Sequence, residues 1–253
     1  MRGVRGACVA AAAALCALAQ AAEIRVLSAG AVEPGLRVAI AHHEQASGDR
    51  VTVTLAAAPA LRERSASREA AAAAGYDLLI APQAVLDAAA AAGVVRAQGA
   101  LLGSVGIGVA VRPGAPLPDI ATADALKASL LNAESVIYNR ASTGMLVERI
   151  VRDLGIADAL AAKTTREADG AAVMKHLLQG SSREVGLGAI TEILLHKDQG
   201  LVYVGPLPAA LQSKTIYAAS VAAQALDVAA AERLWRYLGS AEGLAHFRAA
   251  GID

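Results

Sequence analysis

The sequence predicts a two-lobed α/β protein in which each lobe is a mostly parallel sheet flanked by helices. Three observations support this fold class. Short apolar segments alternate with helical patterns, the order that builds parallel sheets covered on both faces. The alternation runs once to about residue 104 and again to about residue 204. One further strand then leads into terminal helices, which favours two lobes joined by extended crossovers over a single doubly wound sheet.

The first part of the chain shows three strand–helix units. The expected strands are rich in apolar or β-branched residues, and the expected helices end near glycine. We expect strands at residues 24–27, 51–55 and 76–80, and helices at residues 35–46, 61–74 and 82–92. A longer strand follows at residues 105–111, and the turn Arg112-Pro113-Gly114 ends it.

The second part repeats the rhythm with shorter strands. We expect strands at residues 134–138, 185–188, 201–204 and 215–221, and helices at residues 123–131, 144–154, 171–179, 227–238 and 241–250. The domain organisation follows from this order. Residues 22–104 and about 226–253 are expected to form lobe 1, and residues about 105–225 lobe 2. Hinge crossings are expected near residue 105 and between about 205 and 225.

The first residues have the pattern of a secretory signal peptide. Arg2 and Arg5 precede an apolar stretch at residues 7–19, and Ala19-Gln20-Ala21 fits a small-x-small cleavage site. The stretch is shorter than the ~20 residues of a membrane-spanning helix. We therefore expect cleavage after Ala21, export to the periplasm and no stable membrane insertion afterwards. The two cysteines both lie in this leader, so the mature chain has no disulfide.

Composition argues against several classes of function. The formal net charge is zero and only 3% of the residues are aromatic. A neutral chain with scattered charge is not typical of proteins that bind nucleic acid or membrane surfaces. Few aromatic rings also argue against base stacking and against carbohydrate binding.

No motif of an enzyme or a cofactor site is recognisable. The loop at Ser28 lacks the first glycine of a nucleophile elbow. No two histidines have the helical spacing of three or four residues that a pair of metal ligands would need. The glycine-rich residues 103–108 lead into a strand rather than a helix, unlike a dinucleotide-binding loop. We therefore predict no catalytic residue, no metal and no cofactor.

Loops that follow strands are the best candidates for a ligand site, because ligands bind at the carboxyl ends of strands in such sheets. Residues 28–31 and 141–144 are small-residue loops, each between a strand and a helix. Helix N-termini fronted by small and hydroxyl residues favour anions. Ser142 and Thr143 fit either as ligand contacts or as simple helix caps.

The chain resembles the periplasmic molybdate-binding proteins of ABC importers. The resemblance is carried by residues 24–31, 76–81 and 106–111, and by the closing pattern at residues 234–238 with 242–252. It implies a type II periplasmic-binding-protein fold whose lobes close on an oxyanion such as molybdate or tungstate. Hydroxyls and backbone N–H groups hold the ion in that family, and an ABC transporter permease is the implied partner.

Together the loops and the resemblance give the expected ligand-binding residues, which are Ser28, Ala29, Gly30, Ala31, Ala57, Ala58, Ser142, Thr143, Gly144, Ala171, Ala189 and Thr191. The family's serines fall at Ala31 and within residues 56–58, and a tyrosine falls at about Ala189. Two alternatives stay open. One is a binder of a small organic acid, with Arg62 or Arg140 pairing its carboxylate. The other is a periplasmic regulatory or assembly factor that kept the fold without the ligand.

Overall fold

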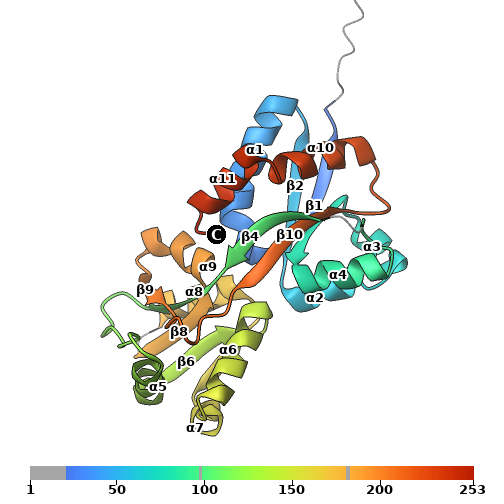
Figure 1. Cartoon of the computed structure of the whole chain (residues 1–253). Helices are drawn as coiled ribbons and strands as arrows, with labels where there is room; N and C mark the ends of the chain where they lie inside the picture. Colours follow the sequence, from blue (N-terminus) through green and yellow to red (C-terminus); the bar gives the residue numbers. More distant parts are fainter. Residues whose placement is uncertain (1–20, 97–98, 181–182) are drawn as a thin grey trace, which may run out of the picture.

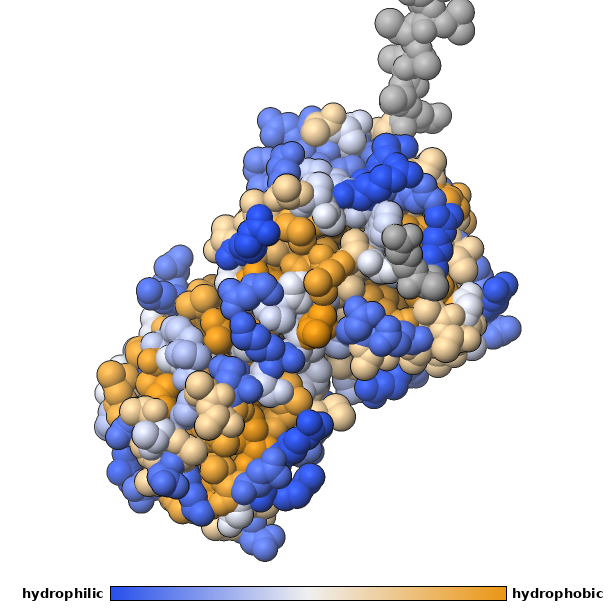
Figure 2. Space-filling model, in the orientation of Figure 1, coloured by the Kyte–Doolittle hydropathy of each residue, from blue (hydrophilic) through white to orange (hydrophobic). Residues whose placement is uncertain are grey.

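The chain folds around two five-stranded mixed sheets, which confirms the predicted two-lobed α/β fold class (Figure 1). The computed structural model describes residues 21–96, 99–180 and 183–253, so the signal-peptide prediction for residues 1–21 lies almost wholly outside the described residues. In each sheet four strands run in one direction and the fifth runs against them, in the fourth position of the order. Figure 2 shows two bulky parts joined by a narrower waist.

The first sheet has the order β2-β1-β3-β10-β4. Its strands are β1 (Glu23–Ala29), β2 (Arg50–Ala56), β3 (Leu78–Pro82), β4 (Ala100–Val105) and β10 (Thr215–Val221). The central β3 is fully buried, as its unbroken apolar sequence predicts. The half-buried β2 alternates exposed threonines with partly buried valines, the pattern of an edge strand.

The second sheet has the order β7-β6-β8-β5-β9. Its strands are β5 (Ile107–Val111), β6 (Ser135–Asn139), β7 (Thr164–Glu167), β8 (Glu184–Ala189) and β9 (Val202–Pro206). The short β7 is not predicted from the sequence, because its residues Thr-Thr-Arg-Glu have no apolar face to bury.

The two lobes are connected by two crossovers. The first is at Gly106, between β4 of one sheet and β5 of the other, next to the crossing expected near residue 105. The strand expected at residues 105–111 corresponds to β5, whereas β4 was not expected as a separate strand. The second lies between β9 and β10. Because β10 pairs with β3 and β4, the return to lobe 1 falls between Pro206 and Thr215. This lies within the range of about 205–225 expected for the crossing, and it puts β10 in lobe 1 rather than in lobe 2.

Helices cover both sheets. Lobe 1 holds η1 (Gly30–Val32), α1 (Glu33–Ser47), α2 (Ala58–Arg64), α3 (Arg68–Ala74), α4 (Gln83–Ala91), α10 (Val228–Leu238) and α11 (Ala241–Ala249). Lobe 2 holds α5 (Ala123–Asn132), α6 (Ser142–Asp153), α7 (Ala157–Ala161), α8 (Gly170–Gln179), α9 (Ile190–Leu195) and η2 (Lys197–Gln199). No helix among these described segments is long and apolar enough to cross a membrane.

The helix expected at residues 61–74 is broken into α2 and α3. Ser65 Oγ donates to the Leu61 carbonyl at the end of α2, and Ser67 Oγ accepts from Ala70 N at the start of α3. Serine competes for backbone groups in this way, and so favours helix ends over helix interiors. The alanine-rich flanks give no sign of this break.

Asp77 fastens the returning chain to lobe 1. Its buried carboxylate accepts from the Arg25 guanidinium at 3.0 Å and from Leu226 N at 2.8 Å. Arg25 belongs to β1 and Leu226 leads into α10, so one side chain joins the first strand to the closing helices. The Arg25 hydrogen bonds hold the pKa of Asp77 below its ordinary value against the opposing effect of burial.

Candidate ligand-binding cleft

A cavity of about 340 Å³ lies between the two lobes. Its walls come from the ends of β1, β2, β3 and β6, and from the helix starts that follow these strands. This is the place where ligands bind in open parallel sheets. The volume lies within the ~300–1,000 Å³ typical of small-molecule sites.

The lobe 1 wall consists mainly of small apolar residues. Residues 29–31 join β1 to η1, and residues 55–58 join β2 to α2. No side chain caps the start of α2 at Ala57, and Pro59 removes one N–H group from its first turn. Among the described residues of this wall only Tyr217 carries a hydroxyl. The wall therefore presents mainly apolar side chains, and its polar side chains are those of Tyr217 and Glu33.

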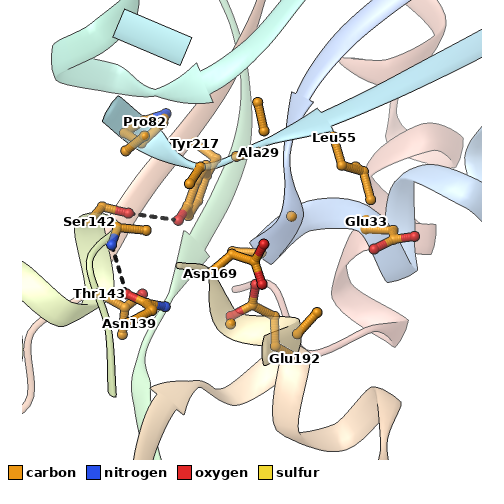
Figure 3. Close-up of a pocket in the computed structure, with 18 of the residues that line it drawn as sticks. Ala29, Glu33, Leu55, Pro82, Asn139, Ser142, Thr143, Asp169, Glu192 and Tyr217 are labelled. Atoms are coloured by element: carbon orange, nitrogen blue, oxygen red, sulfur yellow. Dashed lines mark hydrogen bonds between the residues drawn. The ribbon is translucent and has the colours of Figure 1, made fainter. Parts of the chain in front are cut away.

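The lobe 2 wall is organised by Asn139, the last residue of β6. Its Oδ1 accepts from Ala141 N at 3.0 Å (Figure 3). It also accepts from Gly144 N at 2.9 Å. The bond from Gly144 N caps the first turn of α6, so the Gly144 N–H already has a partner. Ser142 and Thr143, by contrast, both line the cavity, and Thr143 is buried.

A polar contact between two wall side chains joins the lobes. Ser142 Oγ of lobe 2 lies 3.5 Å from the hydroxyl of Tyr217 on β10, a long hydrogen bond (Figure 3). Burial raises the pKa of Tyr217 to about 12. The phenol therefore stays protonated and can donate to a ligand at physiological pH.

Three carboxylates face the cavity, from Glu33, Asp169 and Glu192. Asp169 caps α8 by accepting from Ala172 N, and Glu33 pairs with Arg37 on the next turn of α1. Glu192 has no such partner among the described residues. Figure 3 shows its carboxylate beside that of Asp169. Burial, and then the charges of Asp169 and Glu33, raise the pKa of Glu192 to about 7.

Two glycines make room for the Glu192 carboxylate. A Cβ at Gly170 would lie 1.9 Å from Glu192 Oε2, and a Cβ at Gly30 would lie 3.2 Å from Oε1. Both glycines line the cavity. The side chain of Glu192 therefore bridges the facing walls, with η1 on one side and the start of α8 on the other.

Basic groups lie at the margin of the cleft. His196 lines the cavity, and its Nδ1 lies 2.8 Å from the Glu192 carbonyl. Arg140 does not itself line the cavity, but it stands between the wall residues Asn139 and Ala141, and its exposed side chain forms no ion pair with any described residue. Arg62 is exposed on α2 and does not line the cavity.

The structure brings eight of the twelve expected ligand-binding residues into the cavity wall. These are Ala29, Gly30, Ala31, Ala57, Ala58, Ser142, Thr143 and Ala171. The other four have different positions. Ser28 Oγ is buried against the Ala29 carbonyl, and Thr191 Oγ1 donates to the Ala31 carbonyl at 2.6 Å. Gly144 is the third residue of α6 and does not line the cavity. Ala189 is buried where β8 pairs with β5.

Several wall residues are missed by the sequence analysis. Asn139 ends a strand and Asp169 precedes a helix, so capping rules give a signal for both. Glu192 ends a loop expected at residues 188–192 after a strand, although the structure makes this part of α9, and its carboxylate was not expected to contact a ligand. Tyr217 lies within an expected strand, and strand periodicity alone does not direct its hydroxyl to the cleft.

Comparisons with known proteins agree with this architecture. Residues 24–253 match the family described as bacterial extracellular solute-binding protein. The chain belongs to this family. An aconitate isomerase from a Pseudomonas species is 30% identical to this solute-binding protein over 241 residues, which span 90% of this chain and 87% of the isomerase.

Solved structures of molybdate- and tungstate-binding proteins share the fold. The periplasmic molybdate-binding protein of Azotobacter vinelandii superposes with a TM-score of 0.75 at 14% identity, covering 91% of this chain and 98% of that one. The tungstate ABC transporter protein of Geobacter sulfurreducens gives 0.68 at 14% identity, covering 90% and 98%. The predicted resemblance is therefore confirmed for the fold, and the family is confirmed as one of solute-binding proteins.

Proposed function

We propose that this solute-binding protein captures a small organic acid in the cleft between its lobes. The observation that carries the proposal is Glu192. A carboxyl group with a pKa of about 7 is protonated in a large fraction of molecules at neutral pH. In that form it donates a hydrogen bond to a ligand carboxylate. If all the wall carboxylates were ionised, they would repel the ligand carboxylate instead.

The rest of the wall supports the same ligand class. The α6 start presents Ser142 and Thr143, and Tyr217 donates from the opposite lobe. Arg140 at the margin can pair with a carboxylate in a bidentate manner. The hydroxyls that hold an oxyanion in the molybdate-binding family are replaced by alanine in lobe 1. The relationship to an aconitate isomerase also favours an organic acid over molybdate.

We further propose the setting in which this binding occurs. The family is extracellular and the first residues have the pattern of a secretory signal, which favours the periplasm. Delivery to an ABC transporter permease is the role that this family and fold favour.

Isothermal titration tests the ligand class. We expect trans-aconitate to bind more tightly at pH 6 than at pH 8, because Glu192 ionises between these values. Arg140→Ala should weaken binding, because Arg140 stands between the wall residues Asn139 and Ala141. Arg149→Ala should not, because this exposed arginine lies further along α6, away from any wall residue in the chain. Tight binding of molybdate together with no binding of trans- or cis-aconitate would refute the proposal.

A second candidate is an isomerase acting on the same acid, and Glu192 again favours it. Moving a double bond along an unsaturated acid takes a proton from one carbon and returns a proton to another, with no co-reactant. A carboxyl group with a pKa near the working pH serves both steps. The sequence predicts a non-enzyme, and the similarity to an isomerase makes turnover a necessary test.

NMR in D₂O separates binding from turnover. If Glu192 transfers the proton, trans-aconitate should convert to its cis isomer with deuterium incorporated at carbon, and Glu192→Gln should abolish both. Binding without conversion to the cis isomer in the native protein would leave a binding protein and exclude the isomerase.

A further inference from the structure

We propose that His42, Glu242 and His246 form a site for a divalent transition metal ion on lobe 1, outside the ligand cleft. One ligand atom from each of the three side chains lies within 4.8 Å of the other two. None of the three lines the cavity between the lobes. The proposal therefore stands independently of the proposed function.

Two packed helices bring these side chains together. Glu242 and His246 are four residues apart on α11, so they share one face of the helix. His42 comes from α1, and its ring centroid lies 4.5 Å from that of His246. The helices are held at close range by Gly35, where a Cβ would lie 2.8 Å from Phe247. The backbone of the site is therefore fixed before any ion binds.

The donor set selects a class of metal. Two imidazoles and one carboxylate suit Zn²⁺, and also Ni²⁺ or Cu²⁺, whereas Mg²⁺ prefers oxygen ligands. A tetrahedral Zn²⁺ with ligands at ~2.0–2.2 Å places its ligand atoms roughly 3.3 Å apart. His42 and Glu242 are exposed and His246 is half-buried. Small rotamer changes at the surface are enough to bring the three atoms to this spacing.

A partner orients His246 from behind. Its Nε2 lies 3.2 Å from the Tyr237 hydroxyl, which leaves Nδ1 as the atom for the metal. Metal-bound histidines usually have such a partner on the other ring nitrogen. The Tyr237 ring in turn packs on His43 at a centroid distance of 5.5 Å, and His43 contacts the buried Asp49. The orienting residues are therefore anchored in the core of lobe 1.

The expected consequence is a clamp between α1 and α11. An ion bound by both helices stabilises the folded chain by mass action, because the unfolded chain does not hold the three ligands together. Three protein ligands leave at least one coordination position for water.

Titration of untagged, EDTA-treated protein with ZnCl₂ tests the site. We expect one ion per chain with a dissociation constant in the micromolar range, no comparable binding of MgCl₂, and a higher melting temperature with zinc. His42→Ala and Glu242→Gln should each weaken zinc binding at least tenfold. Glu69→Gln is a matched control, because Glu69 also lies in the first turn of a helix capped by serine, and it should bind zinc like the native protein.

Cobalt gives a second readout. Co²⁺ bound at the site should show the visible absorption of a low-symmetry nitrogen and oxygen site, and that absorption should be lost in His42→Ala. Native zinc affinity in both His42→Ala and Glu242→Gln would overturn the proposal, as would a native protein that binds zinc only at millimolar concentration.

Discussion

Replacing Glu192 by glutamine removes the one carboxylate of the cleft that has no partner among the described residues. The pKa of Glu192 is raised from an ordinary 4.5 to about 7. The folded state therefore holds its proton more tightly than the unfolded state, and stability falls as pH rises from about 4.5 through about 7. A rise of this size corresponds to about 3 kcal/mol for a fully buried group. Because the side chain is partly exposed, we expect about 1–2 kcal/mol.

Thermal melting at several pH values measures this effect. Glu192→Gln should melt at the native temperature at pH 4 and roughly 2–6 °C higher at pH 8. Glu63→Gln, on the exposed face of α2, should show no such pH dependence. A lower melting temperature of Glu192→Gln at pH 8 would falsify the reasoning. That result would mean that the ionised carboxylate is stabilised by the adjoining helix starts rather than repelled by Asp169 and Glu33.

Three further substitutions test the supports of the cleft and of lobe 1. Gly144→Ala should cost about 3 kcal/mol in denaturant unfolding, because its Cβ would lie 1.6 Å from the Asn139 carbonyl oxygen; native stability would show that β6 and α6 can separate. Asn139→Ala should cost about 1 kcal/mol by removing the cap of α6, and an unchanged midpoint would show that water replaces it. Asp77→Asn should cost about 2 kcal/mol at pH 7, and its difference from the native protein should shrink as pH falls through the lowered pKa of Asp77; a constant difference would exclude the ion pair as the cause.

The alternation of strands and helices was predictable because each element carries its own period and its own end signals. β10 (Thr215–Val221) and the closing helices α10 and α11 lie close to their expected bounds. The crossing at Gly106 was expected near residue 105, but the separate strand β4 (Ala100–Val105) before it was not. Residues 100–111 are apolar on both sides of that glycine, and only pairing with two different sheets separates β4 from β5. The separation of β4 from β5 therefore depends on tertiary contacts, which the local sequence does not reveal.

The ligand cleft was predictable in its backbone and much less so in its charged side chains. Loops at strand ends can be found from the order of elements, which is why residues 29–31 and 141–143 were expected and lie in the wall. Glu192 was not expected, because its role depends on Asp169 and Glu33, which come from other elements. The proposed metal site has the same origin, since His42 and His246 meet only through the packing of α1 on α11.

The reversed strand of each sheet has a consequence for the order in which the chain acquires structure. Every strand of the second sheet lies between Ile107 and Pro206, so lobe 2 is one uninterrupted stretch of chain. The first sheet is interrupted, since β10 must insert between β3 and β4 before β4 has any neighbour. During synthesis or export, lobe 1 therefore cannot complete its sheet until residues 215–221 and the last two helices are available. Lobe 2 can fold completely before that point. We expect a chain truncated after Pro206 to retain a protease-resistant lobe 2 and an open, unprotected lobe 1.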